Sequence, residues 1–107
     1  MDRVSIDDFK KLDIRIARIR TADRIEGSER LVTLEIEIGE ETRTLVAGIG
    51  AAYDPTSLPG KEIVVVVNLE PRTLMGVESE GMLLAADDGG PVLLCPDRGV
   101  TPGSKVR

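Results

Sequence analysis

The chain has 107 residues, of which 41% are hydrophobic and 31% are charged, and this length and composition predict one globular domain with one modest core. The formal net charge of −5, taken as a total, argues against a nucleic-acid partner. No apolar run is long enough for a membrane span or a signal peptide, so we expect a cytoplasmic protein without membrane contact.

The chain begins with a short helix signal that is followed by an alternating strand. Ser5 precedes two aspartates in the pattern of a helix N-cap, and Phe9 and Leu12 lie three apart, on one face of a helix that ends near Leu12. Over residues 13–20 the apolar period changes to two, which predicts a strand. Ala17-Arg18 interrupts the alternation in the manner of a β-bulge.

Further strands follow, separated by turns. Val32–Ile38 alternates apolar and polar residues without a break. Thr42–Ile49 comes after a glycine turn, and Ile63–Val67 is apolar on both faces, as is typical of a central strand. Met82–Ala86 and Val92–Cys95 complete a set of six short predicted strands.

One helical interruption is predicted among these strands, at the proline-bounded segment Tyr53–Gly60 between the third and the fourth. Short strands with this single interruption favour a small closed barrel, and a helical element after the third of five strands is typical of the OB-fold. A β-sandwich is the competing architecture, but the chain is short for one. We therefore predict an all-β fold, a five-stranded OB-fold barrel, in one domain over residues 1–107 with a core of about residues 6–95.

Catalysis is not expected, because the chain has no histidine. It cannot by itself build a Ser-His or Cys-His pair or a His-ligated metal site. Ser79 lies between two carboxylates but lacks the glycine that a nucleophile elbow has two positions earlier, where Val77 stands. We predict a protein that is not an enzyme and has neither a cofactor nor a metal.

The charges are unevenly distributed along the chain. Residues 10–30 carry seven Lys and Arg against four Asp and Glu, whereas residues 31–107 carry six against twelve. A basic segment therefore precedes an acidic body. Two interpretations remain open: the segment is a solvated strand face, or it is a stripe that faces phosphates while the acidic remainder limits non-specific association.

Five segments, in this order and at this spacing, resemble one known family. They are Phe9–Ile16, Thr44–Ile49, Asn68–Arg72, Gly76–Met82 and Leu84–Ala86. The chain resembles the tRNA-binding domain at the C-terminus of many methionyl-tRNA synthetases. That domain also occurs in endothelial monocyte-activating polypeptide-like factors, in the N-terminal part of the phenylalanyl-tRNA synthetase β chain, and as small stand-alone proteins. The most specific signal is Asn-Leu-x-Pro-Arg followed by Gly-x-x-Ser-x-Gly-Met.

The resemblance implies an OB-fold that binds tRNA by shape and backbone more than by base sequence. It places the tRNA-binding residues at Arg30, Asn68, Arg72, Ser79 and Met82. An amide can meet a ribose or base edge, an arginine can hold a phosphate bidentately, and a serine hydroxyl can donate to a phosphate oxygen. Met82 offers an apolar surface to a base, although a core position is the alternative. The scarcity of aromatic residues disfavours base stacking.

The first loop departs from the family pattern. Members commonly show Pro-x-Ala-Asp-Lys-Leu, where this chain has Glu-Gly-Ser-Glu-Arg-Leu. Arg30 keeps the basic charge, but the proline and the alanine are absent.

The same resemblance implies partners. Stand-alone members form homodimers through their N- and C-terminal extensions, so we expect a homodimer with a short N-terminal helix and C-terminal extension strands. The expected ligand is tRNA, and an aminoacyl-tRNA synthetase is a possible partner in trans. Two alternatives stay open. One is an export or folding chaperone of the same fold that holds unfolded polypeptides on an exposed apolar patch. The other is an interaction domain within a synthetase complex that does not contact RNA.

Overall fold

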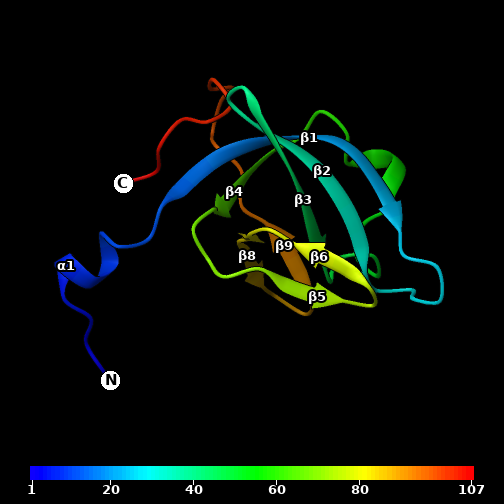
Figure 1. Cartoon of the computed structure of the whole chain (residues 1–107), viewed down its shortest axis with the longest axis horizontal. Helices are drawn as coiled ribbons and strands as arrows, with labels where there is room; N and C mark the ends of the chain where they lie inside the picture. Colours follow the sequence, from blue (N-terminus) through cyan, green and yellow to red (C-terminus); the bar gives the residue numbers. More distant parts are fainter.

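The computed structural model describes residues 1–107 and is built mainly from strands (Figure 1). In chain order its elements are α1 (Ile6–Phe9), β1 (Ile14–Arg24), β2 (Val32–Ile38), β3 (Glu41–Ala47), the 3₁₀ turn η1 (Pro55–Ser57), β4 (Glu62–Val66), β5 (Arg72–Leu74), β6 (Val77–Ser79), β7 (Met82–Leu83), β8 (Ala85–Asp87) and β9 (Pro91–Leu93). Neither helical segment has the length and apolar character that crossing a membrane requires.

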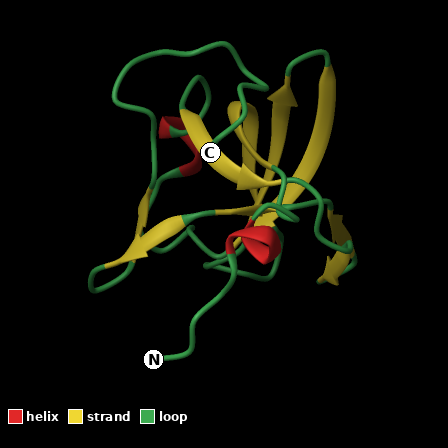
Figure 2. Cartoon of the chain, turned by 90° about the vertical axis from the view of Figure 1, so that its left-hand side faces the viewer, coloured by secondary structure: helices red, strands yellow, loops and turns green.

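A curled five-stranded sheet in the order β3-β2-β1-β4-β7 forms the body (Figure 2). The long strand β1 pairs with β4 through its first half, Ile14–Arg18, and with β2 through Arg18–Arg24. The register shifts between Ile19 and Thr21, so β1 bends where it changes from one neighbour to the next. The result is the half-barrel of an OB-like fold, which confirms the predicted all-β class.

The core lies inside this curl. The apolar residues of β2 (Val32, Leu34 and Ile36) are fully buried, as their strict alternation predicted. They belong to one cluster of 13 buried residues. The cluster contains Ala17, Ile19, Val32, Leu34, Ile36, Leu45, Ala47, Ile49, Leu58, Ile63, Val65, Val67 and Leu93. Truncating a large member to alanine is expected to cost about 2–5 kcal/mol, because the site cannot collapse fully.

The segment 79–83 closes the barrel by contacting both free edges of the sheet. On the β3 edge, the Glu80 amide donates to the Thr44 carbonyl at 2.9 Å. On the β4 edge, Met82 and Leu83 pair with Val66 and Val65. Gly81 lies between the edges at φ +151°, and a Cβ there would stand 3.0 Å from the Val66 carbonyl oxygen. Only glycine fits this passage without displacing backbone.

The C-terminal segment completes the other side of β1. Ile16 exchanges backbone hydrogen bonds with residues 103–104, and the Val106 amide donates to the Ile14 carbonyl at 2.8 Å. A single bridge joins Arg15 to Lys105. The expected C-terminal extension strands are thus reduced to one isolated bridge with flanking hydrogen bonds. The helix α1, by contrast, stands beside the barrel and buries no residue (Figure 1).

Several predicted boundaries differ from the structure. The first strand extends to Arg24, and its irregularity follows Ile19 instead of falling at Ala17-Arg18. The predicted strand Met82–Ala86 is divided into β7, which pairs with β4, and β8, which pairs with β9. The division falls at Leu84, where the chain changes partner.

Candidate nucleic-acid interface

A small arm, defined as residues 68–79, extends from the barrel and carries much of the predicted site. Its two strands, β5 and β6, pair over three residues, from Arg72 opposite Ser79 to Leu74 opposite Val77. Met75 and Gly76 make the turn with φ values of +47° and +81°. Two consecutive positive φ values characterise a type I′ hairpin turn, whose twist matches that of the paired strands.

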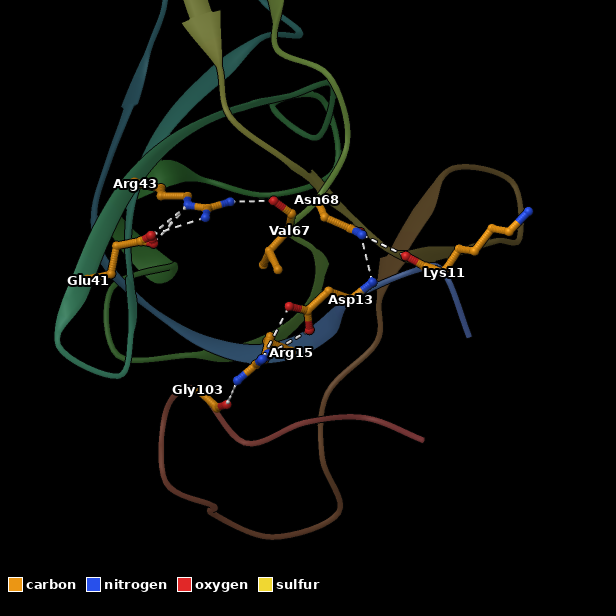
Figure 3. A network of polar contacts seen from close by, with 8 residues as sticks. All are labelled: Lys11, Asp13, Arg15, Glu41, Arg43, Val67, Asn68 and Gly103. Atoms are coloured by element: carbon orange, nitrogen blue, oxygen red, sulfur yellow. Dashed lines mark hydrogen bonds and ion pairs between the residues drawn. The ribbon is translucent and has the colours of Figure 1, made fainter. Parts of the chain in front are cut away.

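Asn68 opens the arm and fixes it to the chain segment that leads from α1 into β1 (Figure 3). Its side-chain oxygen accepts from the Asp13 amide at 2.7 Å, and its side-chain nitrogen donates to the Lys11 carbonyl at 2.6 Å. Both ends of the amide are therefore used within the protein. The side chain expected at a ribose or base edge holds the arm in place.

Ser79 ends the arm and is 5% exposed. Its hydroxyl accepts from the Val46 amide at 2.9 Å and donates to the Gly81 carbonyl at 3.1 Å. The side chain thus takes the place of a backbone partner on the free edge of β3. Because its proton is bound to a carbonyl, the expected donation to a phosphate oxygen is not available in this arrangement.

Arg72 and Met82 face solvent across a groove with a volume of about 460 Å³. The groove is lined by Val46, Leu69, Glu70, Pro71, Arg72, Leu74, Ser79, Gly81 and Met82. Met82 is 48% exposed, so the core position considered for it is wrong. Arg72 takes part in none of the four ion pairs, which join Lys11–Asp8, Arg15–Asp13, Arg20–Glu37 and Arg43–Glu41. The groove therefore offers apolar side chains together with one cation, Arg72, and one carboxylate, Glu70, and neither charge is in an ion pair.

Arg30 lies in the loop between β1 and β2, does not line the groove, and reaches with its side chain to Gly48, just after β3. Its guanidinium covers Gly48, where a Cβ would stand 2.9 Å from the Arg30 Nε. Gly48 follows Val46, a groove residue, by two positions. The structure thus gathers Arg72, Ser79 and Met82 in one groove, places Asn68 at the start of the arm, and leaves the Arg30 side chain beside Gly48.

A second part of the polar network joins β1 to the C-terminal segment (Figure 3). The Arg15 guanidinium pairs with the Asp13 carboxylate at 2.6 Å and donates to the Gly103 carbonyl at 3.2 Å. The side-chain hydrogen bond from Arg15 is the largest of the effects that hold the pKa of the Asp13 carboxyl below its ordinary value. Because the Asp13 amide also binds Asn68, the arm, β1 and the C-terminal segment form one connected network.

Acidic side chains occupy the outer face of β2, next to the groove. Glu35 accepts a hydrogen bond from the Thr44 hydroxyl at 2.6 Å, and Glu37 lies 3.4 Å from the Arg20 guanidinium. Many OB-folds bind oligonucleotides over the strand 2–3 face. Here the carboxylates of Glu35 and Glu37 make that face unfavourable for phosphates.

Sequence reasoning did not identify two groups at this site. Leu69 and Leu74 supply apolar groove walls, and Arg43 lies beneath the arm with its guanidinium directed at the arm's base (Figure 3). The predicted strand Thr42–Ile49 began one residue after Glu41, so the prediction did not show that Glu41 and Arg43 share one face of β3.

Comparison with known proteins gives consistent results. Residues 14–105 match the family model described as "Putative tRNA binding domain". Similar sequences include the methionine–tRNA ligase of Archaeoglobus fulgidus, 50% identical over 106 residues, and that of Caldanaerobacter subterraneus, 47% identical over 107 residues. These matches cover 98% and 99% of this chain but 16% and 17% of the ligases, so the chain spans about one sixth of their length.

Two solved structures resemble the chain over nearly its full length. A MetRS-related protein from Pyrococcus horikoshii has a TM-score of 0.93 at 35% identity and covers 100% of both chains. The chaperone CsaA from Bacillus anthracis has a TM-score of 0.91 at 33% identity and covers 99% of this chain and 100% of its own.

Proposed function

Because this chain belongs to the tRNA-binding domain family, we propose that it is a non-catalytic protein that binds tRNA in the cytoplasm. The observation that carries the proposal is the groove beside the arm, where Arg72 has no ion-pair partner and Met82 is exposed. A groove in which Arg72 is free of ion pairs and lies among apolar side chains suits contact with a backbone and an adjacent ribose or base, although Glu70 lines the same groove. It supplies none of the ring stacking on which many single-strand binders depend.

The predicted site residues divide into two roles. Arg72 and Met82 contact the RNA, and Arg30 adds a phosphate contact at the end of β3. Asn68 and Ser79 shape the arm, since their polar atoms are bound within the protein. This division predicts that changes at Arg72 affect salt-dependent binding, whereas changes at Asn68 and Ser79 act through the structure of the arm.

We further propose a homodimer, and an aminoacyl-tRNA synthetase as a partner in trans. Support for the homodimer comes from the apolar side chains of α1, since Ile6 and Phe9 are 65% and 44% exposed. Together with Leu12 and Val106 they line a depression of about 370 Å³ where the chain's two ends meet. An exposed apolar patch of this kind is typical of an association surface. The synthetase partner rests on the ligases that contain a similar segment.

A filter-binding titration with total tRNA at several salt concentrations tests tRNA binding. Counterion release predicts an affinity that falls steeply as salt rises. Absence of binding at low salt would contradict the proposal.

The alternative is a chaperone that binds unfolded polypeptides. It is favoured by the apolar groove walls and by the similarity to CsaA. A denatured polypeptide that binds in the groove, with an affinity that does not depend on salt, would support this alternative over tRNA.

A further inference from the structure

The base of the arm is held by side chains from three parts of the barrel. Asn68 binds the segment before β1, and Ser79 binds the β3 edge. The third is Arg43, which lies on β3 and is 25% exposed in its side chain. Arg43 had no predicted role at the site, yet its guanidinium lies beside Val67, where the arm leaves the barrel (Figure 3). It also lies near Glu80, where the arm returns.

The contacts of Arg43 bracket the arm. One terminal nitrogen donates a short hydrogen bond to the Val67 carbonyl, the residue before the arm begins. The same nitrogen lies 3.4 Å from the Glu80 carbonyl, the residue after the arm ends. The other two nitrogens bind the Glu41 carboxylate at 3.0 to 3.2 Å. One planar group therefore joins both ends of the arm to a fixed carboxylate on the same strand.

We infer that Arg43 is a positioning residue for ligand binding, which holds the arm so that Arg72 and the groove face the RNA. The inference rests on the proposed tRNA-binding function. Three pairs of residues make a short ladder, and an isolated two-stranded hairpin is marginal in water. The arm therefore depends on its base for a defined orientation. If the arm must become ordered when RNA binds, the free-energy cost of that ordering lowers the affinity for RNA.

Arg43 is poorly placed to act as a phosphate contact itself. Each of its three guanidinium nitrogens already has a partner, and the Glu41 carboxylate neutralises its charge. A neutralised cation releases few counterions when RNA approaches. Arg72 differs because it has no ion-pair partner. The two arginines should thus be separable by salt dependence.

The test uses two variants and a matched control. Arg43→Gln removes both the charge and the guanidinium group with its several N–H donors. Arg43→Lys keeps the charge, but its single ammonium group cannot reach Glu41 and Val67 together as the planar guanidinium does. Arg20→Gln is the control: Arg20 also pairs with a strand glutamate, at 3.4 Å from Glu37, but makes no bond to the arm. Hydrogen exchange of the arm amides and tRNA binding across salt are measured for each.

We expect arm amides to exchange about tenfold faster in both Arg43 variants, as loss of a hydrogen bond from a charged group allows. Affinity for total tRNA should fall by a similar factor while the slope of log affinity against log salt stays the same. Arg20→Gln should leave arm exchange unchanged.

Three outcomes would overturn the inference. A slope that falls by about 0.9 with unchanged exchange would make Arg43 a phosphate contact. If Arg43→Lys has wild-type arm exchange and wild-type tRNA affinity, the charge of residue 43 matters and the geometry of its guanidinium does not. Unchanged exchange in both variants would show that the arm does not need this anchor. If the wild-type protein binds no tRNA, the proposed function fails, and the exchange measurement still decides whether Arg43 anchors the arm.

Discussion

Replacing Ser79 with alanine tests whether this residue closes the barrel or contacts RNA. The substitution removes the oxygen that accepts from the Val46 amide at 2.9 Å. Val46 is 8% exposed, so water has little access to the freed N–H group. A buried donor left without a partner costs about 1–3 kcal/mol. The cavity created by one missing oxygen is small and adds little to this cost.

Urea denaturation followed by circular dichroism measures the effect. We expect Ser79→Ala to lower the free energy of unfolding by about 1–3 kcal/mol through a lower midpoint at an unchanged m-value. Each kcal/mol corresponds to roughly 4–8 °C in the melting temperature of a domain near this size.

Ser5→Ala is a matched control, because the Ser5 hydroxyl also accepts a backbone amide, that of Asp8 at 3.0 Å, but lies exposed on α1. Loss of this N-cap should destabilise α1 by about 0.5–2 kcal/mol, but α1 buries no residue, so the urea midpoint of the barrel should change little. The reasoning is refuted if Ser79→Ala is as stable as the control variant and binds tRNA less well. That result would make the hydroxyl a ligand contact.

Four further predictions concern other parts of the molecule. Gly81→Ala should lower the free energy of unfolding in urea by about 1–3 kcal/mol, the cost of a strained backbone position, because a Cβ would stand 3.0 Å from the Val66 carbonyl oxygen. A wild-type urea midpoint would disprove this close contact. Arg72→Ala should lower the slope of log affinity against log salt by about one unit in filter binding, and an unchanged slope would remove it from the phosphate contacts. The hydrogen bond from Arg15 lowers the pKa of the Asp13 carboxyl. The contribution of Asp13 to the free energy of unfolding is therefore complete above about pH 4 and is lost as the pH falls through the lowered pKa. Asp13→Asn should weaken the pH dependence of the free energy of unfolding in that acidic range, and an unaltered dependence would count against the Asp13–Arg15 pair. Phe9→Glu should convert a homodimer into a monomer of 11.5 kDa by light scattering, whereas a wild-type mass would place the association surface elsewhere.

The fold could be predicted from sequence where the pattern was local. The predicted bounds of Val32–Ile38 agree with β2, because the strand alternates strictly and one of its faces is buried. Met82–Ala86 was predicted as one strand because the chain stays extended and apolar. Its division depends on partners: the Leu84 amide donates to Val64, while the Leu84 carbonyl accepts from Leu94. A periodicity cannot show such an exchange of partners.

The site was predictable in residue type but not in the role of each residue. The motif contains Asn68 and Ser79, yet both partners of Asn68 and one of the two partners of Ser79 lie 55 to 57 and 33 positions away. Nothing near either residue in sequence indicates that its polar atoms are used internally. Arg72 and Met82 line the groove and Met82 is exposed, while their contact with RNA stays a prediction.

The hydrogen bonds of the C-terminal segment have a consequence for aggregation of the protein. Until residues 103–106 reach it, the first half of β1 has backbone groups at Ile14 and Ile16 without their partners on that side. A chain clipped after Cys95 therefore carries an open strand edge that can recruit a strand from another molecule. Clipped chains should aggregate faster than intact ones, because residues 103–106 would no longer cover this edge of β1.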